Sequence, residues 1–160
     1  MQVLVMYYSA SGNTKKLAEA IAKGVQEAGG VRCLVKAAGD VTNDDLVESD
    51  GIIAGSPVYY GAMAARLKAV FDDSVSVRNK MENKVGAAFA TSGDASGGKE
   101  TTLLSIIQAM LISGMIIAGD PLDATGHYGT SCVGAPDEKA SMNGRKLGKR
   151  VAELVKKLKG

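Results

Sequence analysis

The stretch from Gln2 to Thr14, QVLVMYYSASGNT, determines the fold prediction. Its first part is a continuous apolar run, which is typical of a strand buried on both faces of a sheet. Its second part, Ser9–Thr14, consists of small and hydroxyl-bearing residues, and a helical pattern follows it directly. A loop in this position lies at a helix N-terminus, where unpaired N–H groups and a partial positive charge favour an anion. The stretch therefore predicts a phosphate site, with an ordinary Ser/Asn helix cap as the alternative from this loop alone.

Strand and helix patterns alternate along the rest of the chain, and they predict an α/β fold with a parallel sheet and helices on both of its faces. Strands are predicted at 2–8, 31–35, 51–55, 85–90 and 115–118, the second of them at an edge. Helices are predicted at 13–28, 42–47, 63–71, 103–111 and 147–158, whereas residues 74–84 are polar and residues 119–138 are predicted to be a long loop. The length and the absence of linkers or repeats predict one domain, 1–160.

Composition excludes several functions. The formal charge is only +2, with 19 basic and 17 acidic residues and no Trp, so a nucleic-acid interface is not expected. The two cysteines, Cys33 and Cys132, and the single histidine, His127, lack metal-ligand spacing, so no metal site is predicted and His127 is interpreted as an exposed loop residue. No cleavable leader or spanning segment is recognisable, so the prediction is a cytoplasmic protein without membrane insertion.

Three loops, at 9–14, 56–61 and 91–98, each follow a strand and precede a helix. In doubly wound sheets, ligands bind outside the carboxyl ends of the strands. The first loop is neither G-x-x-x-x-G-K-[ST] nor G-x-G-x-x-G, which disfavours a nucleotide triphosphate and fits a phosphate monoester. The second carries Tyr59 and Tyr60; one of them is expected to face a flat ligand, although the sequence does not separate them and packing on the core is the alternative.

The loop SASGNT resembles the phosphate loop of flavodoxins. The segments GSPVYYGAMAARLKAVFD, FATSGDASGGKETT, GMIIAG and HYGTS resemble, in order, segments of the WrbA-type branch of the flavodoxin-like proteins. The resemblance implies a flavodoxin-like three-layer sandwich, with a five-stranded parallel sheet of order 2-1-3-4-5. It also implies FMN as the cofactor, with its phosphate at the first loop and its isoalloxazine ring between the second and third loops. The residues so assigned are Ser9, Ala10, Ser11, Gly12, Asn13 and Thr14; Pro57, Val58, Tyr59, Tyr60 and Gly61; and Thr91, Ser92, Gly93, Asp94 and Gly97.

The resemblance leaves two functions open. The first is flavodoxin-like electron transfer through FMN to redox partner proteins. The second is a WrbA-type oxidoreductase that uses NAD(P)H to reduce quinones. The segment Asp73–Lys84 is short and has no aromatic residue, unlike the corresponding segment of WrbA-type enzymes, which favours the first function. Neither chemistry demands an acid–base side chain, so no catalytic residue is assigned; oligomerisation is left open. A receiver domain is excluded because no acidic pair follows the first strand.

Overall fold

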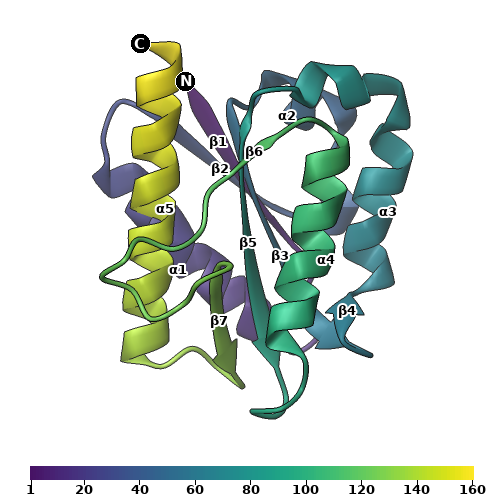
Figure 1. Cartoon of the computed structure of the whole chain (residues 1–160), viewed down its shortest axis with the longest axis vertical. Coiled ribbons are helices and arrows are strands. Elements are labelled where there is room, and N and C mark those ends of the chain that lie inside the picture. Colours follow the sequence, from purple (N-terminus) through teal and green to yellow (C-terminus); the bar gives the residue numbers. More distant parts are fainter.

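The computed structural model describes residues 1–160 as a parallel sheet between two layers of helices (Figure 1). The strands are β1 (Gln2–Tyr7), β2 (Arg32–Ala37), β3 (Gly51–Tyr59), β4 (Ala62–Met63), β5 (Val85–Ser92), β6 (Ile116–Ile117) and β7 (Thr130–Val133). The α-helices are α1 (Asn13–Glu27), α2 (Asn43–Glu48), α3 (Ala65–Asp73), α4 (Lys99–Ile112) and α5 (Glu138–Lys159). Two 3-10 helices, η1 (Ala38–Asp40) and η2 (Ser74–Met81), complete the chain. None of the helices is long and apolar enough to cross a membrane.

The sheet has the order β2-β1-β3-β5-β6, and neighbours along this path are parallel. Because β4 is a short hairpin partner of β3, this order is the predicted 2-1-3-4-5 of a flavodoxin-like fold. The edge position predicted for the second strand is confirmed.

Alternation along β1 shows how the sheet separates two cores. Val3 and Val5 join one apolar cluster, which contains residues of α1 and α5, whereas Leu4 and Met6 join the other, with residues of α2, α3 and α4. All four side chains are fully buried, which explains why the strand reads as a continuous apolar run. Figure 1 shows α1 and α5 on one side of the sheet and α3 and α4 on the other.

The predicted loop 56–61 is wrong in its first part, because β3 continues through Ser56 to Tyr59 and pairs with β5 at Ser56 and Pro57. Gly55 faces β1, since its carbonyl accepts the N–H of Tyr8 (3.0 Å). Pro57 has the same orientation, but the pairing of β1 with β3 has ended by then. A proline without an N–H is therefore tolerated inside this strand.

The fifth strand is divided, which the sequence did not predict. β6 is shorter than expected, and the predicted loop 119–138 contains β7, which continues along the same edge of β5. The pairing with β7 also extends β5 to Ser92, two residues into the predicted loop 91–98. Residues 118–129 therefore form an insertion between β6 and β7, which together occupy one position in the sheet. The pairing of β7 with β5 joins residues far apart in the sequence, so no local pattern predicts it.

Helix boundaries differ in the same direction at two positions. α5 begins at Glu138, well before the predicted 147, and Asp137 caps it by accepting the N–H of Ala140 (2.7 Å). α4 begins at Lys99, and the polar segment that follows α3 forms η2. The predicted start of α2 is confirmed, because Thr42 and Asp45 form a capping box there.

Candidate functional site

The three predicted loops lie at one edge of the sheet because three adjacent parallel strands end there. β1 ends in register with β3 at Tyr7 and Gly55, and β3 reaches Pro57 opposite Thr91 of β5. This edge is at the lower end of the sheet in Figure 1. The order 2-1-3 changes winding direction between β1 and β3, which is where doubly wound folds bind ligands.

Side-chain and backbone contacts join each loop to the others. Thr14 at the start of α1 and Thr91 at the end of β5 are buried, and their hydroxyl oxygens are hydrogen-bonded at 2.8 Å. The rings of Tyr8 and Tyr59 meet edge to face, with centroids 6.2 Å apart. A Cβ added to Gly98 would lie 3.0 Å from the Cα of Gly61, so the third loop approaches the second closely.

The helices that follow the three loops share a feature that the other two helices lack. α1, α3 and α4 begin without a side-chain cap, whereas Thr42 and Asp137 cap α2 and α5. At α1 the cap position is Gly12, in the left-handed region at φ 92°. The helix termini that follow the three loops therefore present N–H donors that the chain itself does not satisfy, and such donors need water or a ligand.

The first loop shows this most clearly. The Ser9 hydroxyl accepts the N–H of Gly12 (3.1 Å) and shapes the turn. The backbone N–H groups of Ser11, Asn13, Thr14 and Lys15 have no acceptor within the chain. Ala10 and Ser11 are exposed, while Thr14 is buried. The first loop is thus a set of free donors at a helix N-terminus, which is the physical description of an anion site.

The third loop is held by bonds of its own. The Ser92 hydroxyl donates to the carbonyl of Asp94 (2.7 Å), and Ser96 donates its N–H (3.0 Å) and its hydroxyl (2.9 Å) to the Asp94 carboxylate. The two bonds from Ser96 lower the pKa of Asp94, so this exposed side chain carries a negative charge at neutral pH. The serine hydroxyls are therefore used inside the loop, and what remains for a ligand is its backbone, including the exposed Gly93 and Gly97.

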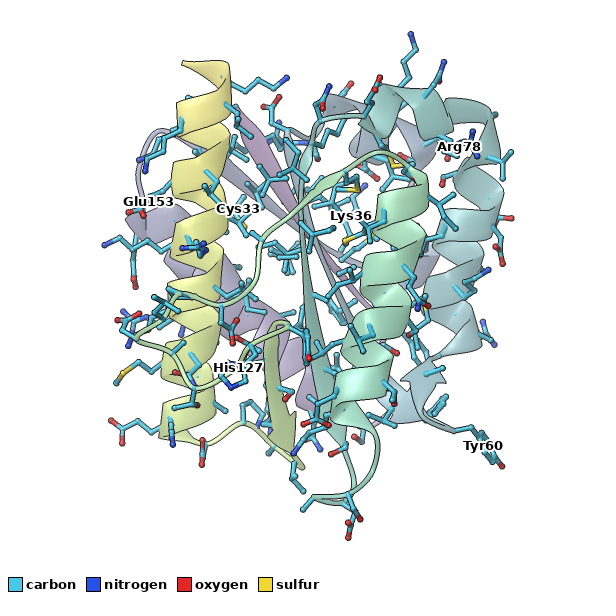
Figure 2. The ribbon with its side chains drawn as sticks, viewed as in Figure 1. Cys33, Lys36, Tyr60, Arg78, His127 and Glu153 are labelled. Carbon is cyan, nitrogen blue, oxygen red and sulfur yellow. The ribbon has the colours of Figure 1, made fainter.

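The second loop is the turn of a β-hairpin between β3 and β4. Tyr59 pairs with Ala62, and the two residues between them have positive φ, 51° at Tyr60 and 74° at Gly61. Such a turn fits a hairpin but is rare for a bulky residue such as Tyr60, and strain of this kind gathers at functional sites. Tyr59 is 44% exposed and packs on Tyr8, whereas Tyr60 is fully exposed. Figure 2 shows Tyr60 extending from the hairpin away from the body of the molecule.

Sequence reasoning missed a cavity beside the first loop. It has a volume of about 650 Å³ and shares Ser9 and Gly12 with that loop. Its other walls come from residues 37–43 and from α3, neither of which was assigned to a site. His127, by contrast, lies exposed between β6 and β7, as predicted. The sequence offered one indication of this cavity: residues 37–43 follow the carboxyl end of a strand, where ligands bind in such sheets. That indication applies to every strand and does not single out this segment.

Comparisons with known proteins agree with this geometry. A family model described as NADPH-dependent FMN reductase matches residues 35–128. An NAD(P)H dehydrogenase (quinone) of Archaeoglobus fulgidus is 33% identical over 189 aligned positions, which cover 98% of both chains. The solved structure of an archaeal flavodoxin is 32% identical, covers 98% of this chain and 99% of its own, and superposes with a TM-score of 0.83.

The fold, the site and these relatives define a flavodoxin-like flavoprotein with a redox function. The chain belongs to the NADPH-dependent FMN reductase family, within the flavodoxin-like group of FMN proteins. Membership implies a flavin as the cofactor.

The name of one relative includes a second cofactor, an iron–sulfur cluster. An iron–sulfur flavoprotein of Methanocaldococcus jannaschii is 46% identical over 122 residues, which are 71% of this chain but only 63% of that protein. Iron–sulfur clusters are held mostly by four cysteine thiolates. This chain has two cysteines, and no three His, Cys, Asp or Glu side chains are grouped to hold a metal ion. Its residues therefore do not fit such a cluster.

Proposed function

We propose that the three loops bind FMN and that the chain transfers electrons through it as a flavodoxin-like carrier. The observation that carries the proposal is the set of uncapped helix N-termini at the edge where the three loops meet. FMN has one group for each part of this edge: a phosphate for the free donors of the first loop and a flat ring for the other two.

The phosphate belongs at the first loop on this proposal. Residues Ser9, Ala10, Ser11, Gly12, Asn13 and Thr14 surround it. The free N–H groups of Ser11, Asn13, Thr14 and Lys15 are its donors, and the absence of a Cβ at Gly12 leaves space for close approach. A phosphate there completes the capping that α1 lacks.

The ring lies between the second and third loops. Pro57, Val58, Tyr59, Tyr60 and Gly61 form one wall, and Thr91, Ser92, Gly93, Asp94 and Gly97 form the other. Bound FMN supplies the redox chemistry, and the chain orients it and tunes its potential. The Gly61 backbone is the group that we expect to hydrogen-bond the ring. The Asp94 carboxylate is ionised beside it and opposes added negative charge, which lowers the reduction potential.

Chain length favours the carrier over the enzyme. The alignment with the quinone dehydrogenase has 189 positions for a chain of 160 residues, so that relative contains insertions that this chain lacks. The archaeal flavodoxin covers this chain almost end to end. Between α3 and β5 this chain has only η2 and a short turn. A carrier needs an accessible ring but no separate pocket for a quinone.

The second candidate is reduction of a quinone by NAD(P)H, and the named activity of the Archaeoglobus relative favours it. Stopped-flow mixing of the FMN-loaded chain with NADPH, and then with a benzoquinone, separates the two functions. The carrier hypothesis predicts turnover far below about 10 s⁻¹, the typical rate of an enzyme. Turnover at or above that rate contradicts the carrier hypothesis and supports the enzyme. On the carrier hypothesis the partner is a larger redox protein.

A further inference from the structure

A second cavity lies between α3 and α4, outside the proposed FMN site, and is called here the α3–α4 groove. One face of each helix lines it, and it extends from β4 to η2. Its volume of about 470 Å³ lies within the usual range for small-molecule sites, roughly 300–1,000 Å³. Figure 1 shows α3 and α4 on the same face of the sheet. None of the residues assigned to FMN lines this groove, so it is a separate compartment.

The groove is elongated, because each wall is a stripe of side chains along a helix. The lining residues recur at intervals of three or four, which places them on one face of a helix. They include Phe71, Val75 and Arg78 from α3 and η2, and Ser105, Ala109 and Ile112 from α4. At a rise of 1.5 Å per residue, the stripe on α4 is about 10 Å long. The shape therefore suits a long and narrow ligand.

The end of the groove at β4 is apolar. Met63 and Phe71 line it and pack against the core on this side of the sheet. The polar groups at this end are used within the chain. Met63 donates its N–H to the Ser105 hydroxyl (3.0 Å), and that hydroxyl donates its proton to the carbonyl of Thr102 (2.7 Å). An occupant of this end therefore needs an apolar body rather than hydrogen-bonding groups.

The groove has one uncompensated charge. Lys68 and Asp72 also line it, but they form a salt bridge with each other. Arg78 on η2 is exposed and takes part in none of the salt bridges of the chain. Figure 2 shows Arg78 and Tyr60 near opposite ends of α3, so this cation lies at the end of the groove away from β4. That end is therefore suited to an anionic group.

We propose that the α3–α4 groove binds an elongated aliphatic carboxylate, a fatty acid of medium chain length. The carboxylate binds the Arg78 guanidinium, whose paired N–H groups match two oxygens. The hydrocarbon chain extends along the groove to Met63 and Phe71. It also covers Val75 and Ile112, which are 72% and 69% exposed, and removing such apolar surface from water stabilises the complex. The inference does not depend on the proposed function.

Calorimetric titration of the FMN-loaded chain with decanoate tests the proposal. Octanoate, which buries two fewer methylenes, should bind roughly tenfold more weakly. Arg78→Gln should weaken decanoate about tenfold, through the lost bonds between charged groups, but should bind the neutral octanol like the wild type. The matched control Lys80→Gln changes another exposed cation of η2, outside the groove, and should bind decanoate normally. No binding at millimolar decanoate, or equal affinity in Arg78→Gln and the wild type, overturns the proposal.

A second variant tests the place of binding. Ala109 is half-buried in the wall from α4, so Ala109→Phe fills the groove and should weaken decanoate more than tenfold while FMN binding is unchanged. Normal decanoate affinity in this variant would place the acid elsewhere. If decanoate does not bind and Ala109→Phe instead dissociates a dimer in sedimentation, a second copy covers the groove and the proposal is wrong. A chain that binds FMN but not decanoate contradicts this inference alone, whereas one that binds decanoate but not FMN contradicts the proposed function alone.

Discussion

Thr14 and Thr91 are 77 residues apart in the sequence, yet their hydroxyl oxygens lie 2.8 Å apart in a buried hydrogen bond. The bond ties the first turn of α1 to the end of β5, and so joins the first loop to the third. A hydroxyl has one donor and two acceptor positions, so the threonine that accepts keeps its own proton for a further acceptor. At Thr14 that acceptor is, on our proposal, the FMN phosphate.

Replacing Thr14 by Val should weaken FMN binding. Valine keeps the shape of the buried side chain but removes a donor to a charged group, which is worth about 1.5–3 kcal/mol, or roughly a ten- to hundredfold rise in Kd. Quenching of flavin fluorescence measures the change. The control Thr125→Val removes a hydroxyl from an exposed loop position and should bind FMN like the wild type. Unchanged affinity in Thr14→Val would mean that the phosphate lies elsewhere.

Substitutions of the two hairpin tyrosines should affect FMN binding differently in the same assay. Tyr59 packs on Tyr8 at the meeting point of the loops, whereas Tyr60 extends into solvent. We expect Tyr59→Ala to raise the Kd for FMN about tenfold through the loss of aromatic contact, and Tyr60→Ala to change it less than about twofold. The opposite order would show that Tyr60 turns back onto the ring when FMN binds.

The crossing of α1 and α5 should tolerate no side chain at Gly24. A Cβ there would lie 1.9 Å from the carbonyl oxygen of Arg145. Gly24→Ala should therefore lower the free energy of unfolding by about 1–3 kcal/mol, despite the better helix propensity of alanine. Urea unfolding measures the change. Gly39→Ala is the control, since nothing lies within 4 Å of a Cβ added there. Equal stability of the two variants would contradict the close packing of Gly24 against Arg145.

Asp120 should make stability depend on pH. Burial raises the pKa of its carboxyl group above the ordinary 3.8, and its Oδ2 has no hydrogen-bond partner. As pH rises from 3.8 through the raised pKa, the folded state holds more protons than the unfolded state, so stability falls through that window. Asp120→Asn can still accept the bond from Thr130 (3.1 Å) while removing the charge.

Urea unfolding of Asp120→Asn and the wild type across this pH range measures the effect. The variant should gain stability relative to the wild type as pH rises to neutral, and the gain should be absent below pH 3.8. A stability difference that does not change with pH would show that the Asp120 carboxyl titrates alike in the folded and unfolded states.

Local patterns predicted most of the fold. Three predictions that depend only on neighbouring residues were confirmed. They are the buried strand β1 from its apolar run, the helix α1 from apolar residues at every fourth position, and the start of α2 from the capping pattern at Thr42–Asp45. The order of the sheet came from the family resemblance and also holds. The predictions of one domain, a cytoplasmic location and possible oligomers stay predictions.

What the sequence did not predict depends on contacts between distant residues. β7 exists because Cys132 pairs with Thr91, and Ser56 and Pro57 belong to a strand because β5 continues beside them. The cavity arises only where residues 37–43 meet α3. In the site itself, the loops were predicted correctly to meet, but the use of the Ser92 hydroxyl within its own loop depends on a fold that no local pattern encodes.

The central claim is that the first loop binds the phosphate of a flavin. The most direct test compares the affinities of the flavin-free chain for FMN and for riboflavin, which differ only in the phosphate. Two or more hydrogen bonds from free N–H groups to a charged phosphate predict FMN binding tighter by at least about a hundredfold. Equal affinities for the two flavins would contradict the account.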